Sequence, residues 1–293
     1  MKVILYMERI KLAIEKAKAG EGDSTKSAVA RLRQVVDSES PAGGSGSTTQ
    51  SDAVLGSPIA VQYSQTAVVQ LDAAHLERHR VVSHQKAHPA SWAFDVLRTQ
   101  VLQKMDENGW RTLAITSPSS ESGKTVVSIN LAMSIAQQTH RTALLVDFDL
   151  RRPSVASTLG LNRTISLNDV LEGHVDIAEA LVNPGIERFV VLPTSRPIPN
   201  ASEMLSSAKV GTLISDLRER YSDRIVIFDL PPILVADDVM AVIPRVDCVL
   251  LVVGSGVSTQ NEIDEAMHRL SRANLLGVVL NKDETPARNA YYY

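Results

Sequence analysis

The sequence predicts an α/β fold, in which a parallel β-sheet carries helices on both faces and is preceded by a flexible N-terminal segment. From about residue 90 onward, short runs of β-branched and other apolar residues alternate with stretches of helical spacing. Strands that are apolar throughout need cover on both faces, which is the arrangement of parallel α/β sheets. The runs expected as strands are 112–116, 142–146, 189–192, 225–228, 249–253 and 276–280. The stretches expected as helices are 91–105, 125–138, 203–220 and 259–273.

The first 89 residues lack this alternation. In residues 7–18 apolar side chains recur at three-and-four spacing, which predicts a short amphipathic helix. The following stretch is rich in Ser, Gly and Thr and buries too little apolar surface to offset its ordering entropy, so we expect a flexible linker whose last part, near 60–90, is poorly ordered or loosely docked. The expected division is 1–18 for the helix, 19–89 for the linker, 90–285 for the α/β domain and 286–293 for a tyrosine-rich tail.

Composition excludes several classes of protein. A formal net charge of -3 argues against a duplex nucleic-acid binder, because there is no basic excess to release counterions. The single cysteine, Cys248, lies in an apolar run and is expected to be a buried small hydrophobe. Residues 1–6 are too short and too weakly apolar for a signal peptide, and no apolar run approaches the ~20 residues that span a bilayer. A reducing cytoplasm is therefore the expected location.

The segment 117–125, SPSSESGKT, follows the first expected strand and opens a helix, which is the context of a P-loop. Backbone N–H groups at a helix start favour phosphate, and Gly123 lets the chain approach it closely. Lys124 is expected to reach the β- and γ-phosphates and the Thr125 hydroxyl to ligate Mg²⁺. The alternative is a chance Gly-Lys-Thr in a loop, since Pro118 stands where the usual first glycine would be. The residues expected to contact the nucleotide here are Ser120, Glu121, Ser122, Gly123, Lys124, Thr125 and Val126.

Two further expected strands end in aspartates. Asp147 and Asp149 follow the strand 142–146 and project to the same side of an extended chain, where a bound cation would relieve their repulsion. Asp229 comes directly after the expected strand 225–228. An aspartate at the end of a buried strand can hold a water molecule that is bound to Mg²⁺. The alternatives are a solvated strand end paired with arginines and an ordinary turn. Three strand ends that each supply a residue type needed by Mg–ATP favour one functional site.

The segments SPSSESGKT, LLVDFDLRRP and IVIFDLPPIL resemble the Walker A, Walker A′ and Walker B motifs of bacterial tyrosine autokinases, a family tied to capsular and extracellular polysaccharide synthesis. The resemblance runs from about residue 90 to 282, and the N-terminal part is similar to variants associated with exosortase-type gene clusters. It implies a MinD-like (SIMIBI-type) P-loop NTPase fold, ATP and Mg²⁺ as cofactors, and transfer of the γ-phosphate to C-terminal tyrosines.

The resemblance also implies roles for individual residues. Asp147 would help to deprotonate the tyrosine, Asp149 and Asp229 would organise the metal, and Asn281 would read adenine, unless Asn281 only caps a turn. The implied catalytic set is Asp147, Asp149, Lys124 and Arg151. The implied metal set is Thr125, Asp147, Asp149 and Asp229.

The tail ends in Tyr291, Tyr292 and Tyr293, half of the six tyrosines in the chain, after a polar stretch that predicts a mobile segment. We expect these residues to be the phosphoacceptors, in trans; the alternative is an aromatic tail that docks on a neighbour. Implied partners are further copies of the chain, a membrane-embedded polysaccharide chain-length protein of the Wzz type that recruits it to the inner face of the membrane, and a cognate tyrosine phosphatase.

The sequence departs from the family at its oligomerisation motif and in its short tyrosine cluster, and it leaves two rivals. At the spacing of the family's Glu-x-x-Arg-x-x-Arg oligomerisation motif stand Trp92, Asp95 and Arg98, so only the last residue fits. One rival is a MinD/ParA-type ATPase switch, although the signature lysine of that class is replaced by Ser119. The other is a catalytically weak, ATP-sensing regulator of the polysaccharide machinery.

Overall fold

A computed structural model describes residues 2–4, 66–138 and 140–283. Its centre is a nine-stranded sheet in the order β1-β9-β8-β3-β7-β4-β6-β5-β2. The strands run parallel except at two pairings, because β1 is antiparallel to β9 and β5 is antiparallel to β6. The strands are β1 (Lys2–Ile4), β2 (Ala67–Val68), β3 (Thr112–Thr116), β4 (Thr142–Asp147), β5 (Val182–Asn183), β6 (Phe189–Leu192), β7 (Arg224–Asp229), β8 (Cys248–Gly254) and β9 (Leu275–Asn281).

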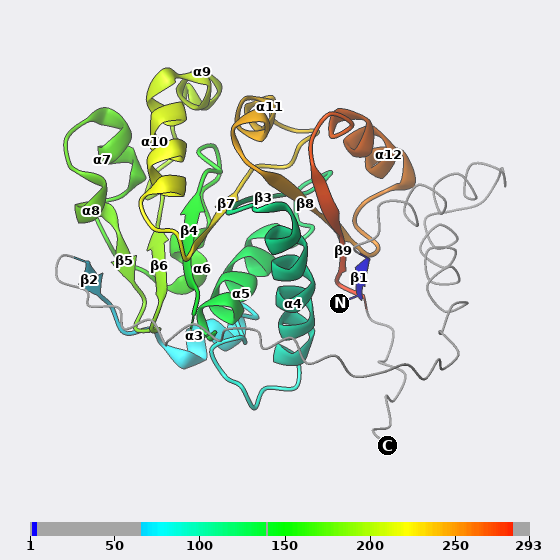
Figure 1. The fold of residues 1–293 in the computed structure, drawn as a ribbon, viewed down its shortest axis with the longest axis horizontal. Helices are drawn as coiled ribbons and strands as arrows, with labels where there is room; N and C mark the ends of the chain where they lie inside the picture. The colour runs from blue at the N-terminus through cyan, green and yellow to red at the C-terminus, as the bar shows by residue number, and fades with distance from the viewer. Residues whose placement is uncertain (1, 5–65, 139, 284–293) are drawn as a thin grey trace, which may run out of the picture.

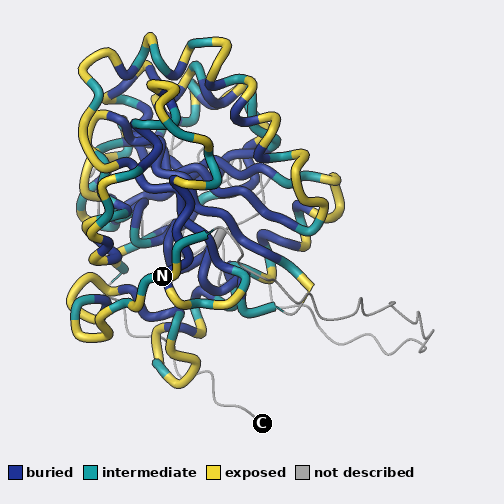
Figure 2. Tube along the Cα trace, turned by 90° about the vertical axis from the view of Figure 1, so that its left-hand side faces the viewer, coloured by how far each residue is buried: buried dark blue, intermediate teal, exposed yellow. Residues whose placement is uncertain are grey.

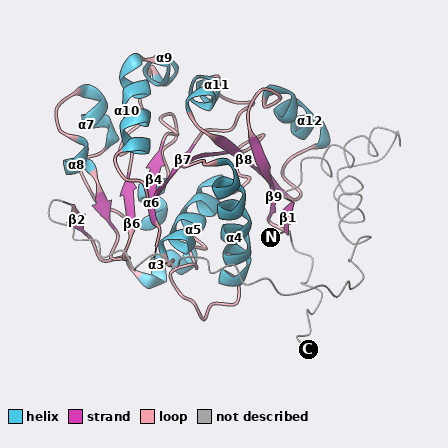
Figure 3. Cartoon of the chain, in the orientation of Figure 1, coloured by secondary structure: helices cyan, strands magenta, loops and turns pink. Residues whose placement is uncertain are grey.

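Helices cover both faces of this sheet (Figures 1 and 3). One apolar core joins the sheet to α3, α4, α5 and α6, and the other joins it to α7 and α9–α12. The helices are α3 (Ala73–Arg78), α4 (Ser91–Asn108), α5 (Lys124–Ala136), α6 (Val155–Leu159), α7 (Leu167–Glu172), α8 (Ile177–Ala180), α9 (Ala201–Ser206), α10 (Ala208–Glu219), α11 (Asp238–Val242), η1 (Ile243–Arg245) and α12 (Gln260–Arg269).

The central strands are apolar because both of their faces are buried. Every residue of β3, β4, β7 and β8 is buried, and Figure 2 shows this buried layer running through the molecule inside an exposed periphery. Successive residues of one strand point into opposite cores, as Leu145 and Val146 of β4 do. Cys248 is buried at the start of β8, as expected from its apolar surroundings.

The expected fold is confirmed, with differences at the edges. All six expected strands and the helices 91–105, 125–138 and 259–273 are present, with ends moved by a few residues. The expected helix 203–220 is instead two helices, α9 and α10, because Ser207 adopts an extended conformation and its hydroxyl accepts a hydrogen bond from the Val210 N–H.

The expectation of a loose segment up to residue 89 is wrong for residues 66–89. Leu76, Val81 and Val82 are buried in the core that contains α4 and α5. The side-chain oxygen of Asn130, on α5, accepts hydrogen bonds from the N–H groups of Val82 and Ser83 at 2.8 and 2.9 Å. The α/β domain therefore includes residues 66–89. Their sequence shows no sustained apolar period because only a few of their side chains are buried. The expected helix 7–18, the linker as far as residue 65 and the tail 286–293 lie outside the described residues.

Within the described ranges, none of the helices has the length and apolar character needed to cross a bilayer.

Candidate active site

The phosphate-binding loop leads from β3 into α5, and its backbone is tightly constrained. Gly123, the N-cap of α5, has a φ of 84°, and a Cβ at this position would lie 2.3 Å from Asn281 Nδ2. The left-handed backbone therefore favours glycine, and a side chain at this position would displace the Asn281 amide. Glu121 has a φ of 62°, a strained value for a residue with a side chain, which is typical of functional loops. The first N–H groups of α5 lack partners within the helix and form an anion-binding end.

Three aspartates end neighbouring strands beside this loop. In the parallel pair of β4 and β7, Asp147 lies opposite Asp229, and Asp149 follows two residues later. All three are buried, with exposed fractions of 0% for Asp147 and Asp229 and 4% for Asp149. The ammonium nitrogen of Lys124 lies 3.0 Å from Asp149 Oδ2 and 3.5 Å from Asp229 Oδ2. The four side chains selected from the sequence therefore meet at the carboxyl ends of β4 and β7.

Asp229 is held in place by two hydroxyl groups of α5. Thr125 Oγ1 donates to Asp229 Oδ2 at 2.7 Å, and Ser128 Oγ donates to Oδ1 at 3.0 Å. A third hydroxyl lies beside them, because Ser154 Oγ is 3.0 Å from Thr125 Oγ1. Ser128 and Ser154 were not selected from the sequence. The spacing of four residues from Lys124 to Ser128, which puts both on one face of α5, is the signal that could have found Ser128.

Asp147 has a different set of partners. Its Oδ2 accepts hydrogen bonds from the N–H groups of Ser154 and Val155, both at 3.0 Å, and its Oδ1 accepts from the N–H of Asp149 at 3.2 Å. The carboxylate therefore ties the start of α6 to the end of β4. Like Asp229, it does not line the cavity described below.

The charges at this site shift one another's protonation. Burial raises the pKa of Asp147 to about 8, and the nearby carboxylate of Asp229 adds to this effect. Burial likewise raises the pKa of Asp229, against the opposing influence of Lys124. Burial alone would lower the pKa of Lys124, but the carboxylates of Asp229 and Asp149 outweigh it, so this pKa lies above its ordinary value. Lys124 therefore keeps its ammonium group, whereas burial disfavours the ionised forms of Asp147 and Asp229.

The chemistry of this donor set fits Mg²⁺. With all three carboxylates ionised, the Lys124 ammonium group would leave a surplus of two negative charges, and the raised pKa values of Asp147 and Asp229 reflect the cost of that surplus, which a bound divalent cation would offset. The available donors are carboxylate and hydroxyl oxygens, the hard ligands that Mg²⁺ prefers. Thr125 and Asp149 line the cavity described below and are placed to hold the ion, while Asp229, which is hydrogen-bonded to Thr125, and Asp147 are fully buried beside them.

A cavity of about 680 Å³ opens in front of the loop. Of the residues expected to bind nucleotide or metal, those that line it are Ser120, Glu121, Gly123, Lys124, Thr125, Val126 and Asp149. Ser122 is instead buried, and its hydroxyl donates to Ser119 O at 3.1 Å. Asn281 contacts the loop from the side, where its Nδ2 donates to Ser122 O at 3.0 Å. The rest of the lining comes from the loops after β4, β6 and β7.

Arg151 lines the same cavity but is paired with a buried carboxylate. Its Nε lies 2.7 Å from Asp238 Oδ2, and its Nη2 donates to Asp238 Oδ1 at 3.0 Å and to Ser202 Oγ at 2.9 Å. Ser202 also donates to Asp238. This network joins the loop after β4 to α9 and α11. Sequence reasoning missed Asp238 and Ser202, which lie 87 and 51 residues from Arg151 and carry no local motif.

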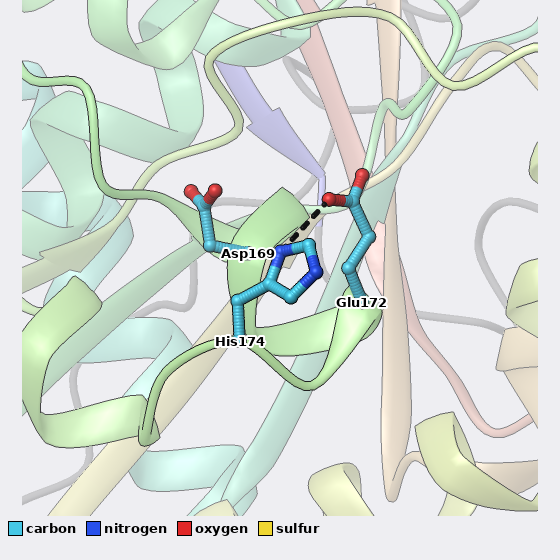
Figure 4. A group of neighbouring side chains, drawn as sticks. All are labelled: Asp169, Glu172 and His174. Atoms are coloured by element: carbon cyan, nitrogen blue, oxygen red, sulfur yellow. Dashed lines mark ion pairs between the residues drawn. The ribbon is translucent and has the colours of Figure 1, made fainter.

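A second group of charged side chains lies apart from the cavity, at the end of α7 (Figure 4). Asp169, Glu172 and His174 place one potential metal-ligand atom each within 4.8 Å of one another. Their oxygens are already engaged, because Glu172 Oε1 pairs with Arg196 at 2.6 Å and Asp169 Oδ2 accepts from the Ser166 N–H at 2.9 Å as part of a capping box. We interpret this group as an ion-pair network that ends α7.

The three residues at the spacing of the family's oligomerisation motif lie on α4; they are Trp92, Asp95 and Arg98. Arg98 Nη1 is 2.9 Å from Asp95 Oδ1 and donates to Ser134 Oγ of α5 at 3.1 Å, so these two side chains join helices within the domain. Trp92 is 58% exposed.

Comparison with known proteins identifies the family of the chain. The family model of the CobQ/CobB/MinD/ParA nucleotide binding domain matches residues 113–291. The tyrosine-protein kinase CpsD of Streptococcus agalactiae is 30% identical over 192 residues, which cover 64% of this chain and 82% of CpsD. The kinase domain of the Escherichia coli tyrosine kinase ETK superposes with a TM-score of 0.66 at 29% identity, covering 78% of this chain and 93% of that domain.

Some relatives are much longer. The tyrosine-protein kinase wzc of Salmonella typhi is 35% identical over 187 residues, and these cover 63% of this chain but 26% of wzc. The chain thus spans about a quarter of that relative and most of CpsD. These similarities favour a kinase over the rival ATPase switch. The chain belongs to the CobQ/CobB/MinD/ParA family of nucleotide-binding domains and, within it, to the bacterial tyrosine-protein kinases.

Proposed function

We propose that this chain is a magnesium- and ATP-dependent tyrosine autokinase that phosphorylates Tyr291, Tyr292 and Tyr293 of a second copy of itself. The observation that carries the proposal is the meeting of Lys124 with Asp149 and the buried Asp229 beside the cavity in front of a phosphate-binding loop. Magnesium, when bound there, would supply charge neutralisation for the triphosphate.

The side chains divide the work of phosphoryl transfer. Lys124 binds the phosphates, and the N–H groups at the start of α5 hold their oxygens. The phenol oxygen of the acceptor forms a bond to the γ-phosphorus while the bond from that phosphorus to the bridging oxygen breaks, and ADP leaves. The phenolic proton passes toward the pair Asp147 and Asp149, of which Asp149 lines the cavity. Asn281 remains a candidate for contact with adenine, since its amide borders the loop.

In the cell, we propose a role in controlling capsular or extracellular polysaccharide production. The named relatives CpsD and wzc are tyrosine-protein kinases, and the site motifs resemble those of kinases tied to that process. The chain would work in the cytoplasm at the inner face of the membrane, recruited by a chain-length protein of the Wzz type, as a homo-oligomer, with a tyrosine phosphatase to reverse the modification.

Mass spectrometry of the purified protein incubated with Mg–ATP tests the kinase proposal. Wild type should carry phosphotyrosine in residues 291–293, whereas Lys124→Met should carry less by on the order of 10²–10³-fold, because the charge that stabilises the transferred phosphoryl group is gone. Lys86→Met, which alters an exposed lysine far from the cavity in sequence, is the matched control and should behave as wild type.

Mixing two variants tests whether the reaction occurs in trans. A chain with Tyr291, Tyr292 and Tyr293 changed to phenylalanine should phosphorylate the intact tail of Lys124→Met. ATP hydrolysis by wild type without any phosphotyrosine would contradict the kinase proposal and support the ATPase switch.

A further inference from the structure

Two adjacent arginines line the cavity, and they have different surroundings. Arg151 is bound through three hydrogen bonds to Asp238 and Ser202. Within the part of the chain that the structure describes, the guanidinium of Arg152 has no hydrogen bond or ion pair, although its backbone N–H donates to Asp149 Oδ1 at 3.0 Å. Arg152 is exposed at the cavity. The structure therefore has one arginine that anchors the loop and one that is free to bind an anion.

The anchored residues fix where Arg152 lies. The Asp238 side chain is fully buried, so Arg151 pairs with an immobile partner. Burial alone would raise the pKa of Asp238, but the hydrogen bonds and charge of Arg151, with the hydroxyl of Ser202, outweigh it and hold this pKa below its ordinary value. With Arg151 bound on one side and the Arg152 N–H bound to Asp149 on the other, the Arg152 backbone is held beside the reacting groups.

The other walls of the cavity suit an aromatic acceptor. Pro197, Ile198 and Pro199 come from the loop after β6, and Val235, which is 64% exposed, comes from the loop after β7. An apolar rim of this kind favours a phenol ring, and a free guanidinium beside it favours a neighbouring anion. The sequence offers a segment with both properties, because three tyrosines stand together at 291–293 and each acquires a charge of about -1.5 to -2 when phosphorylated.

We propose that Arg152 is a specificity-determining residue that binds a phosphotyrosine two positions away from the acceptor tyrosine, so that the first phosphate on the tail promotes transfer of the next. In an extended segment, residues two apart lie on the same side, roughly 7 Å from each other, so Tyr291 and Tyr293 can enter the cavity together. Arginine binds a phosphate through paired, charge-assisted hydrogen bonds, which are the strong ones. The inference rests on the proposed function and names the substrate class of that site.

The test uses the full chain with its own three tail tyrosines changed to phenylalanine and synthetic peptides of residues 283–293 as acceptors. One peptide carries Tyr-Phe-Phe at its end, one carries Tyr-Phe-phosphotyrosine, and a matched control carries Tyr-phosphotyrosine-Phe. The measured quantity is kcat/KM for each peptide relative to the unphosphorylated one, with the KM for ATP recorded separately. We expect about a tenfold gain for Tyr-Phe-phosphotyrosine and little gain for the control peptide, whose phosphate lies on the opposite side.

In Arg152→Gln the kcat/KM for Tyr-Phe-phosphotyrosine relative to the unphosphorylated peptide should fall to near one, and in Arg152→Lys it should be partly restored. The gain should persist in Arg78→Gln, which alters an exposed arginine of α3. Three results would overturn the inference. They are equal rates on all peptides, an undiminished gain in Arg152→Gln, and a rise in the KM for ATP in Arg152→Gln that matches the loss on the phosphopeptide, since Arg152 would then bind nucleotide. Failure of the enzyme to phosphorylate any peptide or the intact tail would instead overturn the proposed function, and this inference with it.

Discussion

Two groups of carboxylates in this molecule have similar compositions and opposite surroundings. Asp147, Asp149 and Asp229 are buried at the carboxyl ends of β4 and β7, with Lys124 as their cation. The group at the end of α7 lies at the surface, where Glu172 is 38% exposed and pairs with an arginine that is itself 49% exposed. Water screens the second group, whereas the first can keep all its carboxylates ionised only with a further bound cation, since burial raises the pKa of Asp147 and Asp229. The binding site is therefore distinguished by the burial of its carboxyl groups and by their excess over cationic groups, and not by the number of acidic residues.

The largest effect should come from Asp229→Asn in the buried group. Tail phosphorylation should fall on the order of 10²-fold or more, because the variant loses the charge that organises the metal. The free energy of unfolding should stay unchanged or rise, since burial penalises the ionised carboxylate in the folded state, as its raised pKa shows. Kinase assays and urea unfolding of the same preparation check both halves. A variant that lost stability but kept activity would show that Asp229 has only a structural role.

A smaller effect is expected for Asp238→Asn, at the edge of the buried region. Removing a buried partner of an ion pair is costly, but Arg151 is 48% exposed and can regain water, so we expect a loss of about 1–2 kcal/mol in unfolding free energy at pH 7. The pKa of Asp238 is lowered in the folded state, so its contribution is present above about pH 4 and declines as the pH falls below that value. Urea unfolding at pH 7 and at pH 3 should show the difference from wild type shrinking at the acid pH. An equal difference at both would argue against the ion pair as its source.

The smallest effect is expected for Glu172→Gln in the exposed group. The pair with Arg196 is solvated, and exposed pairs contribute roughly 0–1 kcal/mol, so the unfolding free energy should change by no more than about 0.5 kcal/mol. Tail phosphorylation should be the same as in wild type. Thermal unfolding with and without added Zn²⁺ gives a further check, and a shift on adding the metal that occurs in wild type and is lost in Glu172→Gln would mean that Asp169, Glu172 and His174 form a metal site.

The sequence was sufficient for the core strands and for the residues at their ends. A buried parallel strand is apolar along most of its length, and the aspartates that end β4 and β7 therefore stand out against it. Gly123 and Lys124, the N-cap and first residue of α5, stand between an apolar run and a helical stretch, and this local pattern predicts a turn into a helix. These features depend on neighbours in the chain, which is why they could be predicted.

Features that depend on distant residues could not be predicted in this way. The docking of residues 66–89 relies on Asn130, 48 residues from Val82, and the place of Arg151 relies on Asp238. The break between α9 and α10 has no proline or glycine to mark it, and it forms because the Ser207 hydroxyl caps the second helix. The hydroxyl of Ser154 lies beside Thr125 because the Asp147 carboxylate accepts a hydrogen bond from the Ser154 N–H and so positions the loop after β4.

The most direct test is a calorimetric titration of the full-length protein with ATP, run once with Mg²⁺ and once with EDTA. Lys124 and the aspartates around it should give saturable binding with the metal, weakening at least about tenfold without it, and Asp229→Asn should lose this difference. Binding that is equal with and without Mg²⁺, or no binding in either case, would contradict the claim that these side chains form a magnesium–nucleotide site.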